Sequence, residues 1–133
     1  MGVPILKQGD YLIASIQSAL SDSDLAQLRD QLVAQVGSRR SRGVIIDLTA
    51  LDVMDSFATR TLTDAVHMIR LRGAETVIVG MQPEVALTMV ELGLSLSGTA
   101  TALDLEEGLI YLDGRAGGRA SGAGVSEDRD DDA

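Results

Sequence analysis

Hydrophobic positions in the first half of the chain alternate between strand-like runs and helix-like spacing. Two short apolar segments, "PILKQ" (4–8) and "YLIASIQ" (11–17), flank Gly9-Asp10 and predict a β-hairpin. After a cap at Ser21 or Ser23, apolar residues recur every three or four positions and predict a helix. The basic, glycine-containing segment "GSRRSRG" (37–43) is expected to end this helix.

The second half repeats the alternation of strand and helix. Continuous apolar runs at 44–48 and 73–80 are typical of strands covered on both faces. Helices are predicted at 56–72, from Pro83 to about Leu92, and at 104–112, the last opening on a capping box of Asp104 and Glu107. A weak strand is predicted at 99–103. In the helix at 56–72, the residues expected to face the core are Phe57, Thr61, Ala65, Met68 and Ile69.

This order of elements predicts an α/β domain at residues 1–114. We expect a mixed, mostly parallel sheet with an antiparallel edge strand from the hairpin, packed with about four helices. Residues 115–133 are rich in glycine and then in acidic residues, with Val125 as the one large aliphatic residue. Such a segment buries too little apolar surface to offset chain entropy, so we expect a disordered tail.

Composition and charge narrow the classes of function. The 133 residues carry a formal net charge of −9, which argues against binding nucleic acid or anionic lipid. The chain has no cysteine, so thiolate chemistry and disulfides are excluded. No apolar run approaches the roughly 18 residues that span a bilayer, and the N-terminus does not resemble a signal peptide. We therefore expect a cytoplasmic protein.

The stretch "GVIIDLTALDVMDSFATRTL" (43–62) holds the most polar strand end of the chain. Its carboxylates Asp47, Asp52 and Asp55 could ligate magnesium or serve phosphoryl transfer. Phospho-acceptor domains also need a lysine after a later strand, and the only lysine is Lys7. The simpler interpretation is that Asp47 and Asp55 accept hydrogen bonds from loop amides. We therefore predict no metal and no cofactor, while nucleotide binding or hydrolysis through Asp47 and Asp52 stays open.

A serine hydrolase is disfavoured. The sequence has no G-x-S-x-G motif. The single histidine, His67, follows Ser56 by eleven residues on the same predicted helix, a rise of roughly 16 Å. The two side chains therefore cannot meet within one chain, and no catalytic residue is predicted.

Ser56 has a third interpretation, as the substrate of another enzyme. It occupies the predicted N-cap of its helix, where a hydroxyl is exposed to a protein kinase. A phosphate there adds about −1.5 to −2 charges, which the helix terminus tolerates and Asp52 and Asp55 repel. We therefore expect phosphorylation to leave the fold intact and to change the electrostatic potential of the surface around Ser56. A simple capping role for Ser56 remains the alternative.

The motifs "YLIASIQ", "GVIIDLTALDVMDSF", "GAETVIVGMQPEVALTMVELGLSL" and "TALDLEEGL" resemble, in order and spacing, the STAS-domain family of anti-sigma factor antagonists. Within it, the chain is most similar to the small single-domain STAS subunit of the bacterial stressosome (RsbS type). The resemblance covers residues 3–112. The tail is longer than this type leads us to expect, and its role is unassigned.

The resemblance implies a non-enzymatic signalling scaffold. Such proteins assemble with sensor proteins that carry a C-terminal STAS domain, hold a serine/threonine protein kinase, and release it once phosphorylated. The serine carries over to Ser56, with Thr59 as a weaker candidate and Asp52, Asp55 and Phe57 as the adjoining partner-binding surface. A phosphatase acting on Ser56, a homodimer and a large hetero-oligomeric assembly are also implied. The alternative is a free anti-anti-sigma factor that binds an anti-sigma kinase directly.

Overall fold

The three inner strands carry aliphatic side chains on both faces, so the sheet forms the middle layer of the molecule. The computed structural model describes residues 3–17, 20–92 and 99–120. Its strands are β1 (Ile5–Gln8), β2 (Tyr11–Ser15), β3 (Gly43–Asp47), β4 (Glu75–Val79) and β5 (Ala100–Ala102). They pair in sequence order, with β1 antiparallel to β2 and every later pair parallel. The predicted mixed sheet with an antiparallel edge strand is confirmed.

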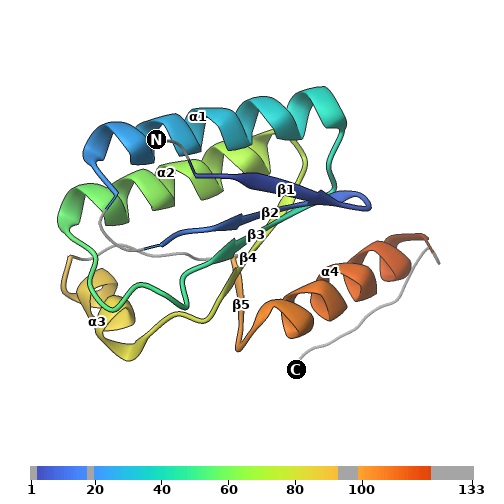
Figure 1. Cartoon of the computed structure of the whole chain (residues 1–133). Helices are drawn as coiled ribbons and strands as arrows, with labels where there is room; N and C mark the ends of the chain where they lie inside the picture. The colour runs from blue at the N-terminus through green and yellow to red at the C-terminus, as the bar shows by residue number, and fades with distance from the viewer. Residues whose placement is uncertain (1–2, 18–19, 93–98, 121–133) are drawn as a thin grey trace.

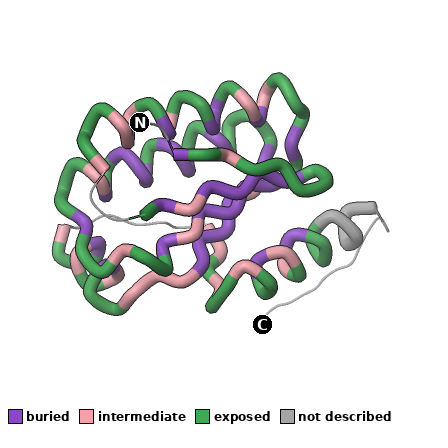
Figure 2. Tube along the Cα trace, viewed as in Figure 1, coloured by how far each residue is buried: buried purple, intermediate pink, exposed green. Residues whose placement is uncertain are grey.

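Helices cover both faces of this sheet. They are α1 (Asp22–Arg39), α2 (Ser56–Leu71), α3 (Pro83–Glu91) and α4 (Leu105–Ala120). Figure 1 shows α1 and α2 side by side over one face, α4 alone over the other, and α3 beyond the strand ends. Successive side chains of each inner strand point to opposite faces of the sheet. Ile46 and Ile78 pack on the face covered by α1 and α2, whereas Ile45 and Val77 pack on the face covered by α4. Buried positions accordingly line the whole length of these strands (Figure 2).

The first helix begins and ends where the sequence predicts. Ser21 caps it, with Oγ accepting from the Asp24 amide, and the Asp24 carboxylate accepts from the Ser21 amide in return. That hydrogen bond to Ser21 is the main reason that the pKa of Asp24 is lowered. The prediction that the segment 37–43 ends the helix is confirmed, because the helix runs to Arg39 and Arg40 caps it in the left-handed region. Gly37 lies inside the helix, where a Cβ would overlap the Arg72 guanidinium.

Two glycines and two tyrosines hold α4 against the sheet. A Cβ on Gly108 would lie 2.9 Å from Val79, and one on Gly43 would lie 2.8 Å from Leu112, so helix and sheet approach closely only because both residues are glycine. The Tyr11 hydroxyl donates to Asp113 at 2.6 Å, and the Tyr111 hydroxyl donates to Glu75 at 2.9 Å. These contacts fix the helix along its length.

The predicted end of α4 at residue 112 is wrong. The helix continues to Ala120, so six residues assigned from the sequence to the tail are helical. The contact between Arg115 and Glu75, at 3.4 Å, extends the helix–sheet interface past the predicted end. Residues 121–133 of the predicted tail lie outside the described residues.

The tyrosine contacts predict a loss of stability at alkaline pH. Burial, together with the hydrogen bond to Asp113, raises the pKa of Tyr11 to about 12. Because the folded-state pKa exceeds the unfolded value, this contribution to stability is complete below pH ~10 and is lost as the pH rises toward 12. We expect Tyr11→Phe to unfold about 0.5–1.5 kcal/mol more easily near pH ~8, by loss of one hydrogen bond. We also expect the variant to lose less stability than the wild type above pH ~10.

Urea unfolding from pH ~8 to ~11.5 measures both effects. Tyr111→Phe is the matched control, because burial and the hydrogen bond to Glu75 also raise the pKa of Tyr111. A Tyr11→Phe variant with the same alkaline loss as the wild type would contradict the assignment.

Candidate functional site

The loop between β3 and α2, residues 48–55, is tied to the carboxyl end of the neighbouring strand. The Leu48 amide donates to the Val79 carbonyl at 2.9 Å and so extends the β3–β4 pairing by one residue. A turn follows, in which the Leu51 amide donates to the Leu48 carbonyl at 2.9 Å. Met54 is buried and Leu51 is half-buried. The polar residues of the loop therefore stand on an anchored backbone.

Asp47 is committed to the structure of this loop. Its Oδ1 accepts from the Thr49 amide at 2.9 Å and from the Thr49 hydroxyl at 2.6 Å. The interpretation that Asp47 satisfies loop amides is confirmed. In residues 3–17, 20–92 and 99–120, no three His, Asp or Glu side chains come together as a metal site.

A second contact locks the loop to the start of α3. The Gln82 side chain donates from Nε2 to the Thr49 carbonyl at 3.0 Å. Gly80 has φ +72°, and a Cβ built on it would lie 3.0 Å from Thr49 Cα and would overlap Thr49 Oγ1. Thr49 therefore occupies the space that a side chain at position 80 would fill. Sequence patterns did not identify Thr49, Gly80 or Gln82, and the only signal was a glycine directly after a strand.

Asp55, not Ser56, caps α2. Asp55 has extended backbone angles, φ −83° and ψ 178°, and its Oδ1 accepts from the Ala58 amide at 2.8 Å. The predicted N-cap at Ser56 is therefore wrong by one residue, because the carboxylate takes the amide that a serine cap would have bound. Asp55 thereby satisfies a backbone amide, as expected for the simpler interpretation of this carboxylate. Ser56 is the first residue of the helix.

The surface around Ser56 is exposed and partly apolar. Asp52, Asp55 and Ser56 are exposed, and Val53 and Phe57 are 72% and 40% exposed. The expectation that Phe57 faces the core is wrong, as it is for Met68 further along α2. A bulky side chain in the first turn lies outside the part of the helix that meets the sheet. The switch residue and the binding-surface residues proposed from the sequence therefore share one open surface.

Thr59 differs from Ser56 in access. It is fully buried, and its hydroxyl donates to the Asp55 carbonyl at 2.8 Å. An enzyme would have to open the first turn of α2 to reach this hydroxyl. His67 is exposed on the same helix, eleven residues from Ser56, and the helical rise separates the two by roughly 16 Å.

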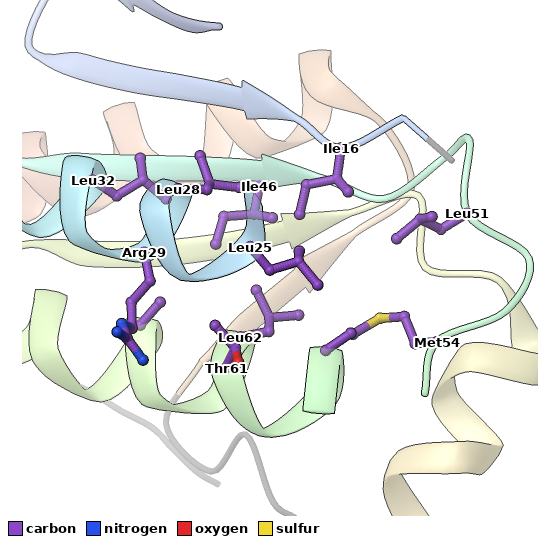
Figure 3. A pocket seen from close by; sticks show the side chains of 12 residues that line it. Ile16, Leu25, Leu28, Arg29, Leu32, Ile46, Leu51, Met54, Thr61 and Leu62 are labelled. Atoms are coloured by element: carbon purple, nitrogen blue, oxygen red, sulfur yellow. The ribbon is translucent and has the colours of Figure 1, made fainter. Parts of the chain in front are cut away.

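An apolar hollow lies directly behind this surface. A cavity of about 30 Å³ lies between α1, α2 and the sheet, and its lining includes Leu51 and Met54 from the loop and Leu62 from α2 (Figure 3). An outer groove of about 190 Å³ shares Leu51 and Met54, and its lining also includes Val53 and Leu20. The loop that precedes Ser56 thus lines an apolar cavity that side chains do not fill completely.

Comparisons with known proteins agree on one family. A model of the STAS domain matches residues 3–107. The structure of RsbS from Moorella thermoacetica, carrying glutamate in place of a serine, is 39% identical, with a TM-score of 0.79, and the alignment covers 86% of this chain and 97% of that one. A chain from the structure "Molecular architecture of the stressosome, a signal integration and transduction hub" is 40% identical, with a TM-score of 0.76, over 85% of this chain and 98% of that one.

One curated relative is much longer. The RsbT co-antagonist protein RsbRA of Bacillus subtilis is 34% identical over 83 residues, which is 62% of this chain and 30% of RsbRA. The match therefore covers less than a third of that relative. No helix in the described part of this chain is long and apolar enough to cross a membrane.

The Gly80–Thr49 contact predicts a large effect of a small substitution. Gly80→Ala must adopt a left-handed backbone, which costs about 1–2 kcal/mol, and must displace Thr49, which costs about 1–3 kcal/mol more. We expect the free energy of unfolding to fall by about 2–5 kcal/mol in urea titrations.

Gly73→Ala is the matched control. Gly73 has φ +88°, but a Cβ added to it would meet open space, so only the backbone cost of about 1–2 kcal/mol applies. Equal losses in the two variants would show that the contact with Thr49 contributes nothing.

Proposed function

This chain belongs to the STAS-domain family, and on that premise we propose that it is a non-catalytic stressosome subunit that holds a serine/threonine protein kinase. Phosphorylation of Ser56 releases the kinase, and a phosphatase acting on Ser56 restores binding. The observation that carries the proposal is the exposure of Ser56, the first residue of α2, together with exposed Asp52 and Asp55 in the same segment.

The cap arrangement favours a phosphate at Ser56 without damage to the fold. Asp55 already caps the helix through the Ala58 amide, so the serine hydroxyl is not required for that bond. The positive end of α2 partly compensates the added charge. Asp52 and Asp55 would stand beside a dianion, so the field at this surface becomes far more negative. A partner that binds here by complementary charge would then lose affinity.

The apolar residues supply the other half of a binding surface. Val53 and Phe57 are exposed on either side of Ser56. Exposed aliphatic and aromatic groups next to charges are typical of the core of a protein interface. Kinase binding at Asp52, Val53, Asp55 and Phe57 would bring Ser56 close to the bound enzyme. Thr59 is a poorer substrate because its hydroxyl is buried.

The comparisons support a role within an assembly. The solved relatives that are 39% and 40% identical are an RsbS with glutamate in place of a serine and a stressosome chain. The match to part of RsbRA, described as an RsbT co-antagonist, is consistent with sensor proteins that carry a related STAS domain. We propose that this chain forms a homodimer and a larger assembly with such sensors in the cytoplasm.

The first test is phosphorylation itself. Incubation with the cognate kinase and ATP should place phosphate on Ser56, located by mass spectrometry, and Ser56→Ala should abolish it. Ser23→Ala is the matched control, because Ser23 is also an exposed serine in the first turn of a helix and is flanked by Asp22 and Asp24. Phosphate that persists in Ser56→Ala, or that vanishes in Ser23→Ala, would refute the assignment.

The second test is affinity. Ser56→Glu adds a charge at the same position and should weaken kinase binding at least about tenfold, or 1.4 kcal/mol, measured by calorimetry. Ser23→Glu should leave binding within about twofold of the wild type, since it adds the same charge at a different helix start. Circular dichroism of both variants should match the wild type. Unchanged affinity of Ser56→Glu would contradict a switch at this residue.

A further inference from the structure

The outer groove borders the segment that carries Ser56. One of its walls is formed by residues after β2 and by the start of α1, and the other by the β3–α2 loop and the first turn of α2. Figure 1 shows the starts of α1 and α2 at the same end of the molecule. The first wall contributes Ile16, Leu20 and Leu25, and the second contributes Leu51, Val53 and Met54.

The lining of the groove is apolar apart from Gln17 and Asp55. Val53 is 72% exposed, and Leu20 is half-buried, so apolar surface borders water at this place. The volume of about 190 Å³ lies below the roughly 300–1,000 Å³ of sites that hold small-molecule ligands. A groove of this size suits one or two side chains of a protein partner.

The groove has room to deepen when it is occupied. The inner cavity of about 30 Å³ shares Leu51, Met54 and Ala58 with it. Figure 3 shows Leu51 and Met54 across from Ile16 and Leu25. Methionine is unbranched and adapts its shape, so the Met54 side chain can turn into the inner cavity as an occupant enters the groove.

The charges beside the groove are negative. Asp55 lines the groove, and both Asp52 and Asp55 are exposed. Among the residues that the structure describes, neither carboxylate forms an ion pair. The described residues of the two walls, 16–17, 20–28 and 48–59, contain no lysine and no arginine. An occupant that combines an apolar side chain with a basic one is therefore complementary to this place.

We propose that the outer groove receives a leucine or methionine side chain of the kinase, with a lysine or arginine beside it that faces Asp52 and Asp55. The inference rests on the proposed function, because the kinase is the partner that must cover Ser56. Asp55 lines the groove and directly precedes Ser56, so an enzyme in contact with the serine also covers the groove. The groove thereby contributes to the choice of kinase, since a kinase without this pair of side chains leaves the groove unfilled and the carboxylates unpaired.

A second copy of this chain fits the groove less well. Two copies related by a two-fold axis through this surface would bring Asp52 and Asp55 of one copy against the same residues of the other. Like charges at such a contact repel, and each copy carries a net charge of −9. The kinase has no such constraint, and we assign the groove to it.

Two variants change the groove in opposite directions. Ala58→Leu fills the space from one wall, and Leu20→Ala removes apolar lining from the other. Calorimetry should show kinase binding weakened at least about tenfold by Ala58→Leu and at least about fivefold by Leu20→Ala. Ala34→Leu is the matched control, since Ala34 is exposed on α1 outside the groove lining, and it should bind within about twofold of the wild type. Circular dichroism of all three variants should match the wild type.

The charge of the rim is tested separately. Asp52→Asn should weaken kinase binding at least about threefold at ~0.01 M salt, where the Debye length is about 30 Å. The difference from the wild type should shrink at ~1 M salt, where this length is about 3 Å. The same affinity as the wild type at both salt concentrations would overturn the charge complementarity.

The kinetics of Ser56 phosphorylation separate binding in the groove from phosphate transfer. Loss of a contact that is equally strong before and during the reaction raises KM and leaves kcat unchanged. In Leu20→Ala, the concentration of this chain at the half-maximal rate should therefore rise with the Kd. A fall in kcat with KM unchanged would show that Leu20 acts through the position of Ser56 and would overturn the proposal.

The remaining outcomes distinguish the groove from the proposed function. Phosphorylation of Ser56 with unchanged kinase affinity in both Ala58→Leu and Leu20→Ala would overturn the groove and leave the proposed function standing. A wild type that neither binds the kinase nor accepts phosphate on Ser56 would overturn both. Analytical ultracentrifugation of the free chain tests the other occupant: self-association that is lost in Leu20→Ala, while kinase affinity is unchanged, would assign the groove to a second copy.

Discussion

The close fit of Thr49 into the space left by Gly80 is the constraint on which the functional surface depends. It joins the ends of β3 and β4, and the hydrogen bonds from Leu48 to Val79 and from Gln82 to Thr49 stand on either side of it. Because these contacts fix the first half of the loop, Asp55 arrives at the start of α2 with the extended backbone that an N-cap needs. The position of Ser56 thus follows from a glycine that lies twenty-four residues further along the chain.

Asp55 caps α2, whereas Ser56 is the proposed site of phosphorylation, so the two roles belong to different side chains. A serine that capped the helix would exchange one hydrogen bond for another on modification, and stability would change with it. Here the carboxylate of Asp55 holds the Ala58 amide, and the buried hydroxyl of Thr59 holds the Asp55 carbonyl. The side chain of Ser56 takes part in neither of these hydrogen bonds. The apolar hollow under Leu51 and Met54 adds room for the loop to adjust when a partner binds.

Sequence patterns predicted the layers of this fold because both signals were strong: continuous aliphatic runs at β3 and β4, and leucines at helical spacing in α1. The end of α4 was predicted less well. The glycine-rich residues after 112 look like a terminator, yet the helix continues to Ala120 and Arg115 contacts Glu75 at the start of β4. The one-residue error at Ser56 has a similar cause, because Asp and Ser are comparable caps and only the backbone distinguishes them. The Thr49–Gly80 fit is tertiary, so no local pattern indicates it.

Arginines at one end and carboxylates at the other give the described domain an electric dipole moment along its strands. Asp22, Asp24, Asp52 and Asp55 stand near the helix starts, and Arg39, Arg40, Arg70 and Arg72 stand near the ends of α1 and α2. Two such bodies orient each other before they touch, with the positive end of one turned toward the negative end of the next. A contact of this kind is heterologous, and repetition of it produces either a ring or an open filament, according to the rotation between neighbours. Charge placement therefore favours the approach of two such domains with opposite ends facing over approach with like-charged ends facing.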